Sequence, residues 1–184
     1  LRKFNLRTNL RNIVYASPAF AFAIPTFPVM IFLPALYTEN FGISVAKVGV
    51  FLFIAKLIDI CSDPIIGWVN DKRICTRKFC IVIGSVLSAI SLCKLFLIEE
   101  IPFESYLLLW IGLLYLGWTM FQIPYLSIGY DLESNYFSRT KLSAVRETFI
   151  LLGLFFSLCL PMLLFLDNVG LAKYLVYIAL ITGF

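Results

Sequence analysis

The sequence predicts an all-α membrane protein, and composition is the first observation behind that prediction. Of the 184 residues, 61% are hydrophobic and only 14% are charged, whereas soluble domains are about 45 to 50% apolar and about 25% charged. A soluble domain of this length could not bury so much apolar surface. The second observation is that the apolar runs are long and continuous. Continuous runs favour helices over the alternating strands of a membrane barrel.

Five apolar runs reach or approach the roughly 20 residues that a helix needs to cross the hydrocarbon core of a bilayer. The runs cover 13–37, 45–69, 79–98, 106–129 and 148–166, and a shorter run covers 171–184. As a helix the short run would rise only about 21 Å, so we expect an incomplete sixth span. The chain starts with Leu and ends inside this run, and we therefore interpret it as a fragment of a longer protein.

Basic residues gather on one side of the predicted spans. They precede the first span, follow the second, or separate the fourth from the fifth, and they are Arg2, Lys3, Arg7, Arg11, Lys72, Arg73, Arg77, Lys78, Arg139, Lys141 and Arg146. The positive-inside rule predicts a multi-pass protein of the cell (inner) membrane with its amino terminus in the cytoplasm. The net charge of +4 then reflects this topology and the anionic headgroups of membrane lipid, and we expect no nucleic-acid partner.

Three ionisable residues lie within the second predicted span, in the run KLIDICSDP. Lys56, Asp59 and Asp63 would each cost about 2.5 to 3.5 kcal/mol at the bilayer centre without a partner or a function. Asp59 and Asp63 are four residues apart, so their carboxylates lie on one face of a helix, one turn apart. With Ser62 and a hydroxyl from another span, they could bind a small cation through oxygen ligands. Without a cation, their mutual repulsion favours a bound proton.

A structural role for the same charges remains open from the sequence. Lys56 could pair with Asp59 as a buried strut while Asp63 caps the end of the helix beside Pro64. Because that arrangement leaves one carboxylate charge unbalanced, we favour the cation site.

Two polar residues of the fourth span also admit two interpretations. Thr119 and Gln122 are three residues apart on one helical face, where they could line a cavity. They could equally serve as hydrogen-bond partners between helices.

The loop after the second span, GWVNDKRICTRK, is short and charged. Gly67, Asp71, Lys72, Arg77 and Lys78 could hold two helix ends together through ion pairs and capping. The pattern resembles the cytoplasmic loop between the second and third helices of the major facilitator superfamily. That resemblance implies a gating role, in which the charges latch two domains in one conformation.

Read together, the motifs resemble one family within that superfamily. The segments YTENFGISVAKVG, KLIDICSDPIIGWVND, FQIPYLS and SRTKLSAVRETF are similar in order and spacing to those of the glycoside, pentoside and hexuronide cation symporters, typified by the melibiose permease. The likeness runs from about residue 15 to residue 156. It implies the amino-terminal six-helix bundle of a major facilitator fold, with its sixth helix truncated. It also implies cation-coupled symport of a sugar, a glycoside or a related small organic solute.

The resemblance assigns roles to individual residues. Asp59 and Asp63 match the family's cation-binding carboxylates, and Ser62 and Thr119 match the polar groups beside that cation. Arg146 matches a basic residue of the fifth helix. The coupling ion would be Na⁺, Li⁺ or a proton, and we expect no other cofactor.

The expected solute site departs from the family pattern. The melibiose permease has sugar-anchoring aspartates at the positions of Ala23 and Gln122, and a tryptophan at that of Leu126. Sugar hydroxyl groups are held best by charged acceptors. We therefore expect Ala23, Gln122, Leu126 and Arg146 to contact a solute that is a different glycoside, an organic anion or an amphipathic lipid.

Two other classes of protein were weighed against a transporter. A membrane transferase would use aspartates to hold magnesium and a diphosphate group, but Asp59, Asp63 and Asp71 do not form a DxxDG or NDxxD pattern and the chain has no histidine, so we expect no enzyme. A non-transporting membrane subunit, or the remnant of a truncated transporter, would also explain half of a transporter. A transporter would require a missing carboxyl-terminal half or a partner chain.

Overall fold

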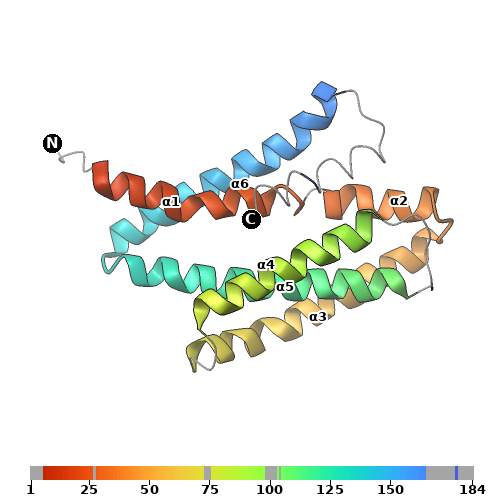
Figure 1. Cartoon of the computed structure of the whole chain (residues 1–184), viewed down its shortest axis with the longest axis horizontal. Helices are drawn as coiled ribbons and strands as arrows, with labels where there is room; N and C mark the ends of the chain where they lie inside the picture. The colour runs from red at the N-terminus through yellow and green to blue at the C-terminus, as the bar shows by residue number, and fades with distance from the viewer. Residues whose placement is uncertain are drawn as a thin grey trace.

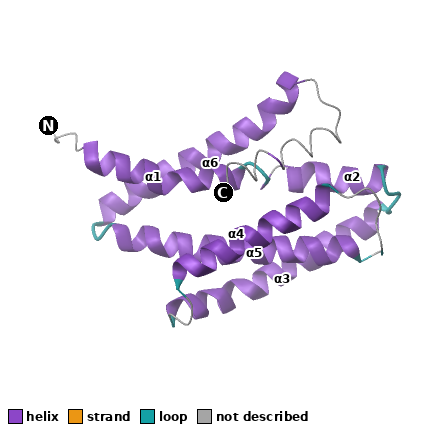
Figure 2. Cartoon of the chain, in the orientation of Figure 1, coloured by secondary structure: helices purple, strands orange, loops and turns teal. Residues whose placement is uncertain are grey.

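The computed structural model describes residues 6–26, 28–72, 76–97, 103, 105–164 and 177, and every regular element in those ranges is a helix. In chain order the elements are α1 (Leu6–Ala23), the π-helical segment η1 (Pro28–Phe32), α2 (Leu33–Glu39), α3 (Val45–Asp71), α4 (Arg77–Phe96), α5 (Tyr106–Leu132) and α6 (Tyr136–Leu164). The long helices run roughly alongside one another (Figure 1), and the described connections between them are short (Figure 2). The expected incomplete span, 171–184, lies outside the described residues except for residue 177.

Among the described residues, three helical segments are long and apolar enough to cross a membrane, judged by length and composition: Arg77–Phe96, Tyr106–Leu132 and Tyr136–Cys159. A shorter apolar helix covers Val29–Glu39. The helix α3 has 27 residues, but Lys56, Asp59 and Asp63 interrupt its apolar surface.

The first predicted span, 13–37, is divided into two parts. α1 ends at Ala23, the turn residues Ile24 and Pro25 follow, and η1 begins at Pro28. Each proline lacks a backbone N–H, and its ring clashes with the preceding turn of a helix. Two prolines three residues apart therefore break the helix at this point.

The helices pack in two groups. One group, the α3–α5 group, consists of α4 against α5 and of α3 against α5; the other, the α1–α6 pair, consists of α1 against α6. In Figure 1 the α1–α6 pair lies above the α3–α5 group. Contacts between α5 and α6 are few. The cavity described below is lined by residues of both groups, whereas the charged cluster lies within the α3–α5 group.

The two halves of the first span belong to different groups. Val29 of η1 and Leu33 and Tyr37 of α2 share one hydrophobic core with Leu95 of α4 and Leu107 of α5. The Tyr37 hydroxyl donates a hydrogen bond to the Leu95 carbonyl at 3.1 Å. The second half of the span is thus packed with the α3–α5 group, while α1 is packed with α6.

Aromatic rings join α1 to α5. The rings of Tyr15 and Tyr125 stack with centroids 4.8 Å apart, and those of Phe22 and Phe121 stack at 3.9 Å. The Tyr125 hydroxyl donates to the Tyr15 carbonyl at 2.6 Å, and the Tyr15 hydroxyl donates to the Tyr125 carbonyl at 3.3 Å. These stacked rings and hydrogen bonds hold the two groups together along one line of contact, the aromatic seam between α1 and α5.

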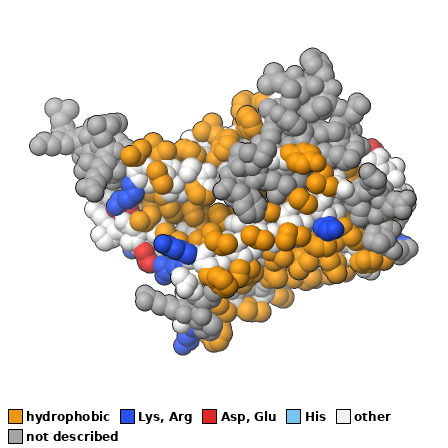
Figure 3. All heavy atoms as spheres, in the orientation of Figure 1, with side chains coloured by type: hydrophobic (Ala, Val, Ile, Leu, Met, Phe, Trp, Pro, Cys, Tyr) orange, Lys and Arg blue, Asp and Glu red, His pale blue; other side chains and the backbone are white. Residues whose placement is uncertain are grey.

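Much of the described surface is apolar. Phe53 and Ile65 of α3, Val82 of α4 and Phe155 of α6 are each more than half exposed, and apolar side chains cover most of the visible face in Figure 3. Contiguous exposed apolar surface of this kind is rare on soluble monomers. It is the surface that a helix presents to lipid.

α4 and α5 approach each other most closely at two glycines. A Cβ at Gly84 would lie 2.7 Å from the Gly117 carbonyl oxygen and 2.7 Å from the Phe121 backbone nitrogen, so Gly84→Ala must push two backbones apart. We expect this substitution to lower the free energy of unfolding by about 1–3 kcal/mol. Gly49→Ala in α3 is the matched control, because a Cβ there meets nothing within 4 Å. Thermal unfolding in detergent checks both, and equal melting temperatures would contradict the expectation.

Candidate functional site

α3 starts at a defined point, and that start sets where its acidic residues lie. Gly42 has a φ of 65°, a left-handed conformation that favours glycine. The Ser44 hydroxyl then caps the helix by accepting the Lys47 backbone N–H at 3.4 Å. From this start, Asp59 and Asp63 lie one turn apart on the face that meets α5.

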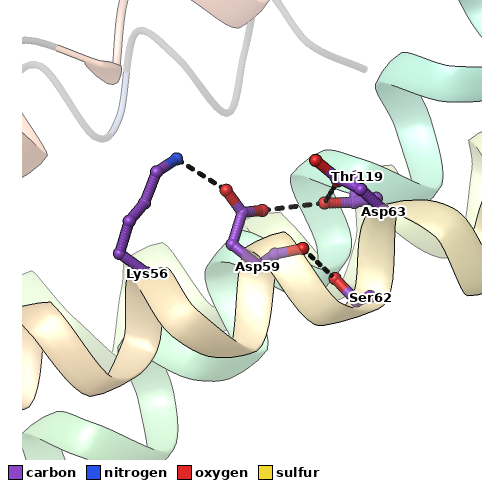
Figure 4. A network of polar contacts seen from close by, with 5 residues as sticks. All are labelled: Lys56, Asp59, Ser62, Asp63 and Thr119. Atoms are coloured by element: carbon purple, nitrogen blue, oxygen red, sulfur yellow. Dashed lines mark hydrogen bonds and ion pairs between the residues drawn. The ribbon is translucent and has the colours of Figure 1, made fainter.

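A threonine of α5 contacts both carboxylates. Thr119 Oγ1 lies 2.9 Å from Asp59 Oδ1 and 3.0 Å from Asp63 Oδ1, and the Thr119 side chain is buried (Figure 4). A hydroxyl carries one hydrogen, so it can donate to only one of these oxygens at a time. A proton on a carboxylate or a cation between the oxygens would stabilise the other oxygen–oxygen contact.

Lys56 supplies one positive charge of its own. Its Nζ donates to Asp59 Oδ2 at 2.6 Å and lies 5.2 Å from the centroid of the Tyr115 ring. The Lys56 side chain is 60% exposed and that of Asp59 is 14% exposed. One ammonium beside two carboxylates leaves the cluster with a net charge of −1 when both carboxylates are ionised.

The structure agrees with one part of the structural interpretation of these charges and contradicts the other. The Lys56–Asp59 pair is present, as the structural interpretation required. Asp63 does not cap the helix, because α3 continues to Asp71; its carboxylate contacts Thr119 instead. The capping role is therefore wrong, and the excess negative charge stands at the contact with α5.

Ser62 is placed differently from the other predicted cation ligands. It is buried, and its hydroxyl donates to the Asp59 backbone carbonyl at 2.9 Å. In Figure 4 the side chain points to that carbonyl and away from the carboxylates. The structure brings together Asp59, Asp63 and Thr119, and leaves the Ser62 hydroxyl engaged within its own helix.

The oxygen ligands that Asp59, Asp63 and Thr119 could provide favour a monovalent cation or a proton. Among the described residues, no three or more His, Cys, Asp or Glu side chains gather closely enough to hold a metal ion. Calcium takes six to eight oxygen ligands, and magnesium needs an octahedral set. Asp59, Asp63 and the neutral Thr119 hydroxyl, together with the Lys56 ammonium, carry a net charge of −1 and match a single positive charge.

One turn along α5 from Thr119 lies a cavity of about 280 Å³. It contains all four residues expected to contact the solute, Ala23, Gln122, Leu126 and Arg146, which come from α1, α5 and α6. The rest of the lining is mostly apolar or aromatic and consists of Ala19, Phe22, Thr26, Phe121, Tyr125, Glu147, Ile150 and Leu154. Tertiary packing thus collects residues that are far apart in the sequence.

Arg146 carries the positive charge of this cavity. One terminal nitrogen of its guanidinium, Nη2, donates to Glu147 Oε1. Its Nε is buried and has no hydrogen-bond partner among the described residues. A buried N–H without a partner is costly, so Arg146 Nε has a donor left for an acceptor oxygen.

The predicted gating loop is only partly described, since 73–75 lie outside the described residues. Gly67 lies within α3, and Lys72 follows Asp71 as the capping residue of that helix. Arg77, at the start of α4, forms an ion pair with Asp131 near the end of α5. Asp131 was not among the residues predicted from the sequence, although its position after the fourth predicted span places it on the same predicted side of the membrane as Arg77.

The long apolar helices and their exposed apolar surface are those of a membrane protein, and the α3–α5 group carries a charged cluster inside it. The family described as MFS/sugar transport protein matches residues 14–183. The chain is 30% identical over 153 residues to YjmB of Bacillus subtilis, an uncharacterized symporter, with 75% of this chain and 32% of that relative covered. It is 27% identical over 164 residues to sll1374 of Synechocystis, another uncharacterized symporter, with 83% and 30% covered.

The chain therefore belongs to the MFS/sugar transport family. It spans about a third of the length of these relatives.

The Thr119 contact can be tested without knowing the ion. Thr119→Val removes the only hydroxyl hydrogen that α5 gives to the two carboxylates, so we expect it to lower the free energy of unfolding by about 1–3 kcal/mol. Thr119→Ser keeps the hydroxyl and should cost less. Denaturant unfolding of the purified protein measures both variants. Equal stability of Thr119→Val and wild type would show that the contact contributes nothing.

Proposed function

We propose that this chain is the amino-terminal half of a cation-coupled symporter that carries a small organic solute across the cell membrane, with its amino terminus in the cytoplasm. The family and the symporter relatives support transport. The observation that supports cation coupling is the Thr119 hydroxyl held 2.9 and 3.0 Å from two carboxylates with one hydrogen to share. Sodium, lithium or a proton would supply the missing positive charge.

The same cluster would couple cation binding to the shape of the solute cavity. A cation shared by Asp59 and Asp63 would pull α5 and α3 together through Thr119. Gln122 stands almost one turn further along α5 and lines the cavity. Cation binding would thereby favour one arrangement of the cavity wall over another, which is the thermodynamic requirement for coupling.

The cavity supports a particular kind of solute. Ala23, Gln122 and Leu126 give its wall no carboxylate, and Glu147 is already paired with Arg146. Arg146 Nε offers a donor, while the stacked rings of Phe22 and Phe121 offer apolar surface. A glycoside or an organic anion with an apolar part would use both. The opposite wall would come from a carboxyl-terminal half or a partner chain, as the greater length of the relatives suggests.

Sodium titration by calorimetry tests the cation site directly. We expect saturable sodium heat with the full-length protein, and a loss of affinity of at least about tenfold in Asp59→Asn and in Asp63→Asn, because each removes one ligand of a charged pair. Asp71→Asn, on the same helix and outside the cluster, is the control. Potassium chloride at equal ionic strength corrects for screening. If neither sodium, lithium nor a pH change alters the protein, the coupling proposal fails.

Lys56 determines the net negative charge of the cluster that would bind the cation. Lys56→Met removes the ammonium from Asp59 Oδ2 and leaves two uncompensated carboxylates, so we expect sodium to bind about tenfold more tightly. Lys47→Met, two turns earlier on α3, should not change sodium affinity. The same calorimetric titration measures both variants. Weaker sodium binding in Lys56→Met would mean that Lys56 supports the site rather than competing with the ion.

A further inference from the structure

The break in the first span leaves a backbone carbonyl without its usual donor. In a continuous α-helix the carbonyl of Ile24 would accept the backbone N–H of residue 28. Residue 28 is proline and has no N–H. Ile24 is fully buried, so water cannot replace the missing bond. An unpaired buried carbonyl would weaken the fold.

A serine from another helix supplies the missing donor. The Ser157 hydroxyl of α6 donates to the Ile24 carbonyl at 2.9 Å, and Ser157 is 1% exposed. The approach is possible because Gly153 stands one turn earlier on α6. A Cβ at Gly153 would lie 2.6 Å from the Phe20 carbonyl oxygen, so only glycine lets α6 come this close to α1.

The bonded carbonyl sits at the junction of the two packing groups. α1, before the break, packs on α6, whereas η1 and α2, after the break, pack with the α3–α5 group. Ala23 and Thr26 flank the break and both line the cavity. The direction in which the first span leaves the break therefore decides the shape of that wall.

We propose that Ser157 is a positioning residue for the cavity: its hydroxyl replaces the N–H that Pro28 lacks and holds the break in the first span against α6. Only the assignment of the cavity to the solute rests on the proposed function. The hydrogen bond and the break are features of the chain whatever it carries. Ser157 touches no solute and acts through the backbone at Ile24.

Hydrogen exchange of the full-length protein in lipid nanodiscs tests this role. The reporter is the Val29 amide, which donates to the Pro25 carbonyl at 3.1 Å across the break. In Ser157→Ala we expect peptides that cover 20–32 to exchange about tenfold faster, the size of effect that follows from losing one hydrogen bond to a buried group. Ser157→Thr keeps the hydroxyl and should restore slow exchange.

Ser91→Ala is the matched control. Ser91 is also fully buried, and its hydroxyl donates to the Leu87 carbonyl at 2.8 Å. That carbonyl lies in the continuous helix α4 and already accepts a backbone N–H. Ser91→Ala therefore removes an equivalent hydroxyl without freeing a carbonyl, and exchange at 20–32 should stay as in wild type. Equal acceleration in both alanine variants, or none in Ser157→Ala, overturns the proposal.

The Pro28→Ala variant provides a second test in case Ser157→Ala alone does not fold. Pro28→Ala restores an N–H at residue 28, so adding Ser157→Ala to it should change exchange at 20–32 less than twofold. Failure of the double variant to fold, when Pro28→Ala alone folds, overturns the proposal. Sodium titration of the same variants tests the proposed coupling separately, because it reports on the cation cluster of the α3–α5 group and not on exchange at 20–32. Absent sodium heat in every variant would count against the proposed coupling, while the exchange data still decide the role of Ser157.

Discussion

Hydrocarbon offers no hydrogen-bond partner, so every backbone carbonyl that a proline leaves unpaired needs a donor from within the protein. Two such carbonyls of the first span are satisfied in different ways. The carbonyl of Val14, four residues before Pro18, accepts the Ser17 hydroxyl of the same turn at 3.0 Å. The carbonyl of Ile24 accepts Ser157 of α6. The first solution is local, whereas the second ties the position of one helix to the bend in another.

Charge inside the bundle imposes a second constraint of the same kind. Asp59 is satisfied from two sides, by Lys56 within α3 and by Thr119 from α5. Asp63 shares the same Thr119 hydroxyl. Because the hydroxyl has one hydrogen to donate, this contact is where the proposed cation or proton would bind. A fold that were only structural would gain by replacing one of these carboxylates with a neutral residue.

Helix α5 connects the charged cluster with the region around the break in the first span. Its Thr119 faces the carboxylates of α3, and its Phe121, Gln122 and Tyr125 face the cavity and the seam with α1. The α1–α6 pair touches the α3–α5 group mainly along that aromatic seam and through the Arg11–Glu133 ion pair at one end. A seam of stacked rings would suit the proposed transport, in which the cavity wall changes shape.

By itself, the sequence determined the class of the protein, because hydrophobic composition and run length depend only on the order of residues. It also placed Asp59 and Asp63 on one face, since the helical period fixes that relation. Only the tertiary structure decided which partners they meet. The Thr119 contact, the Arg77–Asp131 pair and the Ser157 bond to the first span each join residues at least 54 positions apart. Such contacts depend on how helices cross, and helical periodicity carries no information about the neighbour that a given face will meet.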